Sequence, residues 1–223
     1  MNTYTKYWFL EGFNLFQKLG RITMMRMCEI LEMENINKGE TIHLINKDEK
    51  NIFFLKKGSV KIVDTSNDTT KYLVKKGNIF GELSLYDDLS SAEEKAIALE
   101  DCIICYIEAD RMEKIMQKHQ SLKNGVLKVY GLRIKKLERR LQDLLYKDST
   151  SRITDFITDY IQEFGQVENN RMIAKNLLSH KDIAHLTNTS RQTVSNVLSV
   201  LRKENIIDYD SQYVSMLKKP IPT

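Results

Sequence analysis

A short stretch near the C-terminus carries polar side chains of the types that read DNA base edges. They are Arg191, Gln192, Ser195 and Asn196. They lie on the side of the expected helix away from its apolar residues, which recur at helical spacing. An arginine forms a two-pronged pair with guanine in the major groove, whereas glutamine and asparagine pair with adenine. We therefore predict that this face contacts DNA bases.

Groups that suit phosphate flank this face. Free N–H groups at the start of a helix favour phosphate, and hydroxyl, amide and basic side chains there add hydrogen bonds. The predicted phosphate contacts are Ser179, His180, Lys181, Asn188, Thr189, Ser190 and Thr193. The competing interpretation is an ordinary pair of amphipathic helices whose polar face is only hydrated.

Two helices joined by a tight turn are needed to position these side chains. Ser179 is suited to cap the first helix, and Asp182, three residues later, suits the positive helix end. Asn188 falls in the turn, where asparagine tolerates left-handed backbone, and Thr189 or Ser190 would cap the second helix. The residues expected to face the core are Ile183, Ala184, Leu186, Val194, Val197, Leu198 and Leu201.

The run S-R-Q-T-V-S-N, from Ser190 to Asn196, resembles the recognition helix of the Crp/Fnr superfamily of bacterial transcription regulators, S-R-[EQ]-T-[VI]-[SG]-[RN]. The resemblance implies a homodimer in which a cyclic-nucleotide-binding-type β-roll precedes a winged helix-turn-helix. The partners implied are double-stranded DNA with an inverted repeat, a second copy of the chain, and RNA polymerase.

The resemblance also bears on the DNA sequence that is read. In the family, the TGTGA half-site is read by an Arg-Glu pair and a second Arg one turn later. Here Arg191 is kept, but Gln192 and Asn196 replace the other two. Because glutamine and asparagine pair most naturally with adenine, we expect one guanine contact and a more A·T-rich half-site.

The composition is that of an ordinary globular chain. With 223 residues, of which 42% are hydrophobic, there is room for one large domain or two small ones. No apolar run approaches the roughly 18 residues of a membrane span, and no secretory signal is evident. Three cysteines, an odd number, argue against a disulfide framework and fit a reducing cytoplasm. The net charge of +4 permits nucleic-acid binding without demonstrating it.

Short apolar runs between glycine-bearing turns predict a compact β-roll or barrel in the first half of the chain. The expected strands are 41–45, 51–55, 59–63, 71–74 and 102–107, after a helical segment over about residues 8–34. Residues 53–62 resemble the family's hairpin, and residues 77–84 resemble the start of its phosphate-binding cassette.

The cassette lacks the arginine that a cyclic nucleotide needs. Family members that bind one carry G-E-L-[AGS] and then R-[ST]-A, and a bidentate arginine is the group best suited to phosphate. Here no arginine lies between Glu82 and Ile107, and the loop from Asp87 to Glu94 is acidic. We therefore expect no cyclic nucleotide, and we interpret Gly81 and Glu82 as residues that keep the fold. The candidate effector-pocket residues are Gly81, Glu82, Leu83, Ser84, Lys95, Tyr130, Ile134 and Leu137.

No other cofactor and no metal site is predicted. Cys102 and Cys105 have CxxC spacing, but an offset of three along a strand puts the two sulfurs on opposite faces. Cys28 adds one thiolate, whereas a cubane cluster usually needs four. His43 and His119 could each ligate haem singly, although a lone histidine is more often structural or exposed.

A long helix over about residues 110–145 carries an apolar seam. The seam residues alternate in spacing between three and four: Leu127, Tyr130, Ile134, Leu137, Leu141 and Leu144. This spacing is typical of a two-stranded coiled coil, although a helix packed on its own domain would also bury such residues. The resemblance favours the homodimer interface.

The predicted fold class is α+β, in three parts. These are a β-roll domain with N-terminal helices at 1–108, a dimerisation helix at 109–147 and a winged helix-turn-helix domain at 148–223. The last part is expected to contain an amphipathic helix from about residue 153, a polar turn at 165–171, the helix-turn-helix, a hairpin wing at 206–214 and a loose tail.

The predicted function is sequence-specific regulation of transcription, controlled by a signal other than a cyclic nucleotide or constitutive. No catalysis is expected, because the sequence shows no nucleophile–base constellation, metal-ligand cluster or phosphate-cradling loop. The alternative is a cyclic-nucleotide-dependent sensor that acts through protein contacts.

Overall fold

The computed structural model describes residues 6, 7, 10, 13, 16, 20–46, 49–81 and 94–217. The chain divides into two compact units, residues 1–136 and 137–223. The division falls inside a long helix, α4 (Gln120–Tyr146), whereas the sequence placed boundaries after residues 108 and 147.

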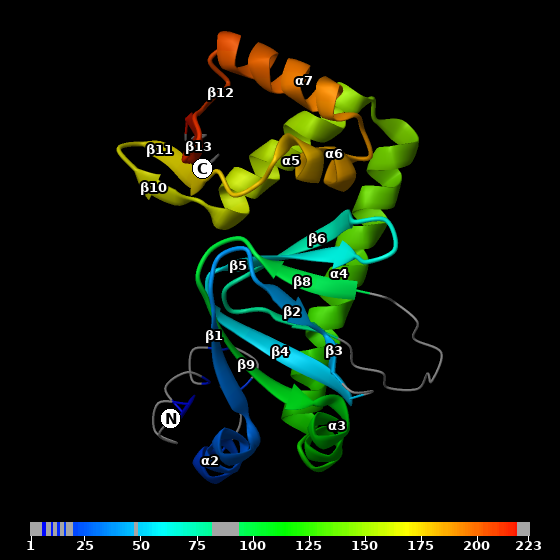
Figure 1. Ribbon diagram of the computed structural model, residues 1–223, viewed down its shortest axis with the longest axis vertical. Helices are drawn as coiled ribbons and strands as arrows, with labels where there is room; N and C mark the ends of the chain where they lie inside the picture. The colour runs from blue at the N-terminus through cyan, green and yellow to red at the C-terminus, as the bar shows by residue number, and fades with distance from the viewer. Residues whose placement is uncertain are drawn as a thin grey trace, which may run out of the picture. The chain divides into compact units, whose positions relative to one another are not determined.

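Two antiparallel sheets form the first unit (Figure 1). One has the order β1-β9-β4-β3, with β7 also paired to β4, and the other has the order β2-β8-β5-β6. The strands are β1 (Glu32–Ile36), β2 (Thr41–His43), β3 (Ile45–Asn46), β4 (Glu49–Lys57), β5 (Ser59–Asp64), β6 (Thr69–Lys75), β7 (Ile79–Gly81), β8 (Glu94–Ala98) and β9 (Cys102–Glu108). The expected β-roll is confirmed. Four of the five expected runs lie on single strands, and the run 41–45 is divided between β2 and β3 at Leu44.

Alternation along β4 and β9 divides the apolar side chains between two cores. Phe53 and Leu55 face the core between the sheets, where Phe53 stacks on Phe80 with ring centroids 5.0 Å apart. Ile52 and Phe54 point the other way, into a second core. Successive strand residues face opposite sides, so one apolar run supplies both cores.

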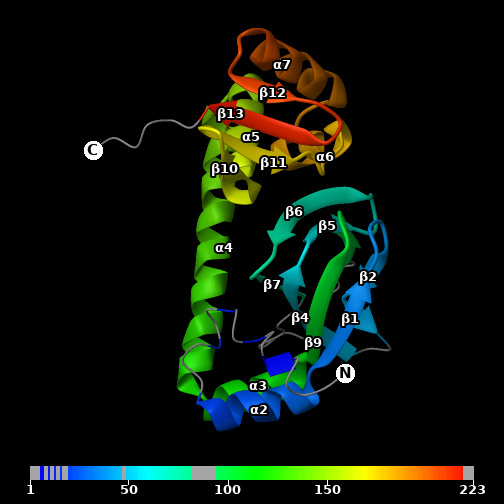
Figure 2. The ribbon, with the colours of Figure 1, turned by 90° about the vertical axis from the view of Figure 1, so that its left-hand side faces the viewer.

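Three helices cover the second core. They are α2 (Arg21–Ile30), α3 (Ala109–Lys118) and the start of α4, and they bury Met24, Met27, Cys28, Ala109, Met112, Met116, Leu122 and Val126. Helices α2 and α3 lie at one end of the β-roll (Figures 1 and 2). The four methionines are suited to this core because their flexible side chains fill irregular gaps.

This unit differs from the sequence-based expectation in several elements. The helix expected over about residues 110–145 is two helices, α3 and α4, which are separated at His119. The predicted helix over residues 8–34 runs too far, since α2 ends at Ile30 and β1 begins at Glu32. Strands β1, β7 and β8 were not predicted. Strand β8 reads E-K-A-I-A, a composition that favours helix, and its pairing with β2 and β5 overrides that preference.

The second unit is a winged helix-turn-helix built on the C-terminal part of α4. Helix α7 lies across α5 and α6, and a four-stranded sheet of order β10-β11-β13-β12 completes the unit (Figure 1). Its elements are α5 (Ser149–Phe164), β10 (Gln166–Glu168), β11 (Arg171–Lys175), α6 (His180–Thr187), α7 (Arg191–Lys203), β12 (Ile207–Tyr209) and β13 (Tyr213–Leu217). The helix from about residue 153 and the wing are confirmed, and the tail lies outside the described residues.

The polar segment 165–171 is a hairpin rather than a plain turn. Asn169 and Asn170 have φ of 46° and 62°, which is the pair of positive values that a tight two-residue hairpin needs. Strands β10 and β11 pair across it, with Gln166 opposite Ile173. This hairpin was not predicted from the sequence. All three residues of β10 are exposed, so the strand lacks the alternation of buried and exposed residues that would identify it.

Candidate nucleic-acid interface

Helix α6 begins with a complete capping box. The Ser179 hydroxyl accepts a hydrogen bond from the Asp182 backbone N–H at 3.1 Å, and the Asp182 carboxylate accepts one from the Ser179 N–H at 3.0 Å. Asp182 is buried, so the box satisfies a carboxylate that would otherwise be costly to bury. The predicted cap is therefore in place, and it fixes where α6 starts.

The turn after α6 reverses through a left-handed residue. Asn188 has φ 51° and ψ 57°, as its position in the turn predicted. The buried hydroxyl of Thr187 donates to the Ile183 carbonyl at 2.7 Å and lies 2.9 Å from the Thr189 hydroxyl. The side chain of Thr189 thus faces the turn, and Ser190 provides the cap of α7.

Helix α7 presents the polar face that the sequence predicted. Ser190 accepts from the Thr193 N–H at 3.0 Å, and the two hydroxyls lie 2.8 Å apart. Arg191, Gln192 and Asn196 are exposed and Ser195 is half-buried. The opposite stripe is buried and consists of Val194, Val197, Leu198 and Leu201. Burial of that stripe fixes the rotation of α7 and so aims its polar face outward.

Two arginines that the sequence did not single out hold the turn. Arg152, on α5, donates through Nε to the Thr187 carbonyl at 3.0 Å and through a terminal nitrogen to the Asn188 carbonyl at 3.2 Å. Arg140, on α4, donates to the His185 carbonyl at 3.1 Å. Helix C-termini carry unpaired carbonyls and partial negative charge, which guanidinium groups satisfy. Burial lowers the pKa of Arg140 below its usual value.

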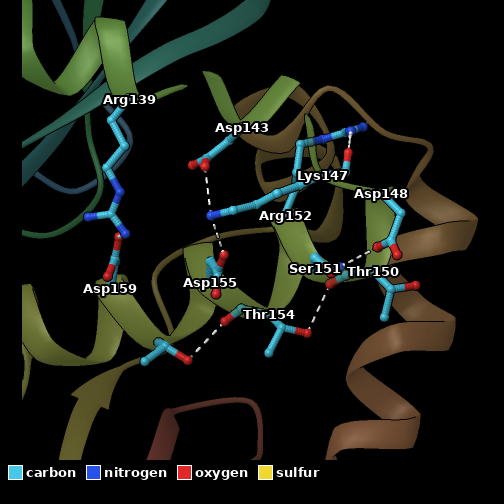
Figure 3. Close-up of polar contacts among 11 residues, drawn as sticks. Arg139, Asp143, Lys147, Asp148, Thr150, Ser151, Arg152, Thr154, Asp155 and Asp159 are labelled. Atoms are coloured by element: carbon cyan, nitrogen blue, oxygen red, sulfur yellow. Dashed lines mark hydrogen bonds and ion pairs between the residues drawn. The ribbon is translucent and has the colours of Figure 1, made fainter. Parts of the chain in front are cut away.

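Further polar contacts join α4 to α5 (Figure 3). The Lys147 ammonium lies 2.6 Å from the Asp143 carboxylate and 2.7 Å from that of Asp155, and these hydrogen bonds raise its pKa. Arg139 pairs with Asp159 at 3.4 Å, and Arg152 also donates to the Lys147 carbonyl at 2.7 Å. The end of α4 and the helix-turn-helix are therefore linked within one unit.

The predicted phosphate contacts surround the two helix starts. Ser179, Lys181, Asn188 and Ser190 are exposed, whereas His180, Thr189 and Thr193 are half-buried. The structure thus brings all seven to the ends of α6 and α7.

The effector candidates fall in different places. Glu82, Leu83 and Ser84 lie outside the described residues. Gly81 has φ 93°, and a Cβ there would collide with the Asn51 carbonyl, which gives the glycine a structural reason. Lys95 pairs with Asp68 at 3.7 Å. Tyr130 is half-buried against the second core, whereas Ile134 and Leu137 are exposed.

The cysteines lie as the strand geometry predicted. Cys102 faces the core between the sheets and Cys105 the second core, on opposite sides of β9. Burial raises the pKa of Cys102 to about 11 and that of Cys105 to about 12, so both remain thiols at neutral pH. Among the residues that the structure describes, no three His, Cys, Asp or Glu side chains gather in a way that suits a metal.

The seam of α4 is largely exposed. The exposed fractions are 51% for Leu127, 56% for Ile134, 53% for Leu137, 59% for Leu141 and 36% for Leu144. Tyr130 is the seam residue that packs on its own unit. Within the described part of the chain, no helix has the length and apolar character that crossing a membrane requires.

Comparison with known proteins matches both units to families. Residues 33–119 match the cyclic nucleotide-binding domain, and residues 151–219 match the Crp-like helix-turn-helix domain. The chain belongs to the Crp/Fnr superfamily. Members of this superfamily regulate transcription, and this chain is a transcription regulator with a DNA-binding helix-turn-helix.

Relatives cover most of the chain. The global nitrogen regulator of Synechococcus elongatus is 26% identical over 181 residues, 79% of this chain and 82% of that protein. The CRP-like cAMP-activated global transcriptional regulator of Mycobacterium tuberculosis is 21% identical over 188 residues, 83% of this chain and 84% of the relative. A mutant of CooA from Carboxydothermus hydrogenoformans shares the fold, with a TM-score of 0.70, 20% identity, and coverage of 95% of this chain and 91% of CooA.

The arginine contacts to the turn predict a stability difference between two variants. Arg152→Met keeps the apolar stem but removes the donors to the two turn carbonyls and to the Lys147 carbonyl, so it should lower the free energy of unfolding by about 1–2 kcal/mol. Arg139→Met removes an exposed ion pair and should cost less than about 0.5 kcal/mol. Urea unfolding of the full chain measures both. Equal losses would contradict the role given to Arg152.

Proposed function

We propose that this regulator binds an inverted-repeat DNA site as a homodimer and reads bases with α7. The observation that carries the proposal is the exposed set of Arg191, Gln192 and Asn196 on the side of α7 opposite a buried apolar stripe. The helix is fixed by burial, so these side chains emerge on one side, where a major groove could receive them. Cationic and hydroxyl groups at the starts of α6 and α7 supply phosphate contacts that set the register.

The homodimer is proposed from the seam of α4. Five of its six apolar residues are more than a third exposed, which is unusual for so regular an apolar pattern on a helix. A second copy of α4 would cover them at coiled-coil spacing. Two-fold pairing also matches an inverted repeat with half-sites about 10 base pairs apart. RNA polymerase is the further partner expected of a regulator of this kind.

The proposed signal is not a cyclic nucleotide, and constitutive activity is also compatible with the sequence. Relatives include a regulator described as cAMP-activated, so the fold itself permits that ligand. This chain, however, has no arginine between Glu82 and Ile107 to neutralise the phosphate. Lys95, the nearest candidate substitute, is paired with Asp68.

If the seam of α4 is the dimer interface, charged residues introduced into it should abolish the dimer. Ile134→Glu with Leu141→Glu would place carboxylates in a desolvated seam, at a cost of several kcal/mol each, so the dissociation constant should rise by more than about 100-fold. Lys128→Glu with Lys135→Glu changes exposed α4 residues off the seam and should leave the dimer intact. Sedimentation equilibrium measures both, and an intact dimer in the seam variant would refute this interface.

The proposed contacts predict that substitutions of a base-contacting residue and of a phosphate-contacting residue lower DNA affinity in different ways. Arg191→Ala should cost about 1–3 kcal/mol and relax preference at one base pair, because a base contact is removed. Lys181→Ala should weaken binding to all sequences alike and reduce the salt dependence by about one unit of slope. Binding to a selected site and its single-base-pair variants, at several salt concentrations, separates the two.

The assignment of the reading face fails if Arg191→Ala lowers affinity equally for every sequence. If Arg191→Ala leaves DNA binding unchanged while a protein partner is lost, the alternative of regulation through protein contacts is favoured. Sedimentation of the same variant controls for an altered dimer.

The missing arginine predicts that cyclic AMP shows no site of micromolar or tighter affinity in titration calorimetry. A phosphate without a bidentate cation beside it keeps its desolvation cost. A tight site would overturn this prediction. Loss of such a site in Lys95→Met would then assign Lys95 as the cation.

A further inference from the structure

The two amide side chains on the reading face of α7 are bonded to each other. The Gln192 amide nitrogen, Nε2, donates to the Asn196 carbonyl oxygen, Oδ1, at 3.0 Å. The residues are one turn apart, which is the spacing at which helix side chains meet. Both are exposed, so the bond lies on the surface that the proposed function presents to DNA.

The hydrogen bond engages a donor of the Gln192 amide and the acceptor of the Asn196 amide. A carboxamide has two N–H donors and one carbonyl oxygen, and adenine is read by one N–H and that oxygen together. Gln192 gives one N–H to Asn196 and keeps its second N–H and its oxygen, which form the pair that adenine requires. Asn196 accepts this bond with one of the two lone pairs of its carbonyl oxygen, and the bond holds that oxygen toward Gln192, so its NH₂ group is the part that is free to turn toward other partners.

We propose that Gln192 and Asn196 read one adenine together rather than one adenine each. Gln192 makes the two base contacts, and Asn196 acts as a positioning residue that holds the Gln192 amide in the reading orientation. Its own NH₂ then donates to an acceptor, such as a neighbouring base edge or a phosphate. This inference rests on the proposed function and narrows it, because the half-site contains one adenine specified by this pair.

The hydrogen bond between Gln192 and Asn196 is expected to contribute less in water than in a complex with DNA. An exposed pair one turn apart stabilises a helix by a factor of only about 1.4 to 2.3 in water. In a water-excluded groove the same hydrogen bond is stronger, and an amide held in place loses less rotamer freedom on binding. Its effect is therefore expected in discrimination between bases rather than in the stability of α7.

The test uses the site selected from random DNA by the full-length chain, with every single-base-pair variant of that site. The protein variants are Gln192→Ala, Asn196→Ala, the double variant and Asn196→Asp. Ser199→Ala, an exposed residue further along α7, is the matched control and should bind as the parent does. Affinities are measured by fluorescence anisotropy at one salt concentration.

The proposal expects Gln192→Ala and Asn196→Ala to relax the same A·T pair, each lowering its preference by roughly 5- to 150-fold, the value of one bidentate contact. The double variant should be no worse than Gln192→Ala alone. Asn196→Asp keeps an acceptor for Gln192, so preference for that A·T pair should persist while overall affinity falls through charge repulsion.

If Gln192 and Asn196 each read a separate base, the variants should show the opposite pattern of affinities. That result would overturn the proposal. Asn196→Ala would then relax a second base pair, the two losses would multiply in the double variant, and Asn196→Asp would switch that second pair toward cytosine. If the parent chain preferred no sequence at all, the proposed function would fail and this inference with it, and that outcome is visible before any variant is made.

Discussion

The hydrogen bonds from two arginines to the turn of the helix-turn-helix are the constraint on which the rest of the DNA-binding unit depends. Three carbonyls at the end of α6 accept them, those of His185, Thr187 and Asn188. The His185 carbonyl also accepts from the Asn188 N–H, whereas the Thr187 and Asn188 carbonyls lie at the negative end of α6 and take these bonds from Arg152. The turn sets the angle at which α7 leaves, so these contacts also fix the direction of the reading face.

The arginines come from different helices, and this has a mechanical consequence. Arg152 belongs to α5, but Arg140 belongs to α4, which also carries the exposed seam. Lys147 also connects the two helices, because its ammonium forms ion pairs with Asp143 on α4 and Asp155 on α5 (Figure 3). The C-terminal part of α4 therefore belongs to the same compact unit as α7. Pairing of two seams, as proposed, would act on the recognition helices through these contacts.

Local rules predicted the helix-turn-helix closely because they act over a few residues. The Ser179 cap, the left-handed Asn188 and the buried stripe of α7 follow from spacing and side-chain type, and all are present. The β-roll was predicted as a class, but β8 and the hairpin at Asn169 and Asn170 were not. Strand β8 depends on pairing partners distant in sequence, and β10 has no buried face.

The contacts that hold the site were beyond the reach of pattern reasoning. Arg140 and Arg152 are 45 and 36 residues from the furthest turn carbonyls that they meet. Nothing in their immediate sequence separates them from other basic residues on polar helix faces. The bond between Gln192 and Asn196 has a visible spacing of four, but either amide could equally have pointed to solvent.

Selection of bound sequences from random DNA by the full-length chain is the sharpest test of base reading by α7. We predict enrichment of an inverted repeat whose half-sites lie about 10 base pairs apart, each with a guanine and an adjacent A·T-rich segment. Enrichment of the unmodified TGTGA palindrome would contradict the role given to Gln192 and Asn196. No enrichment of any sequence would contradict base reading by α7.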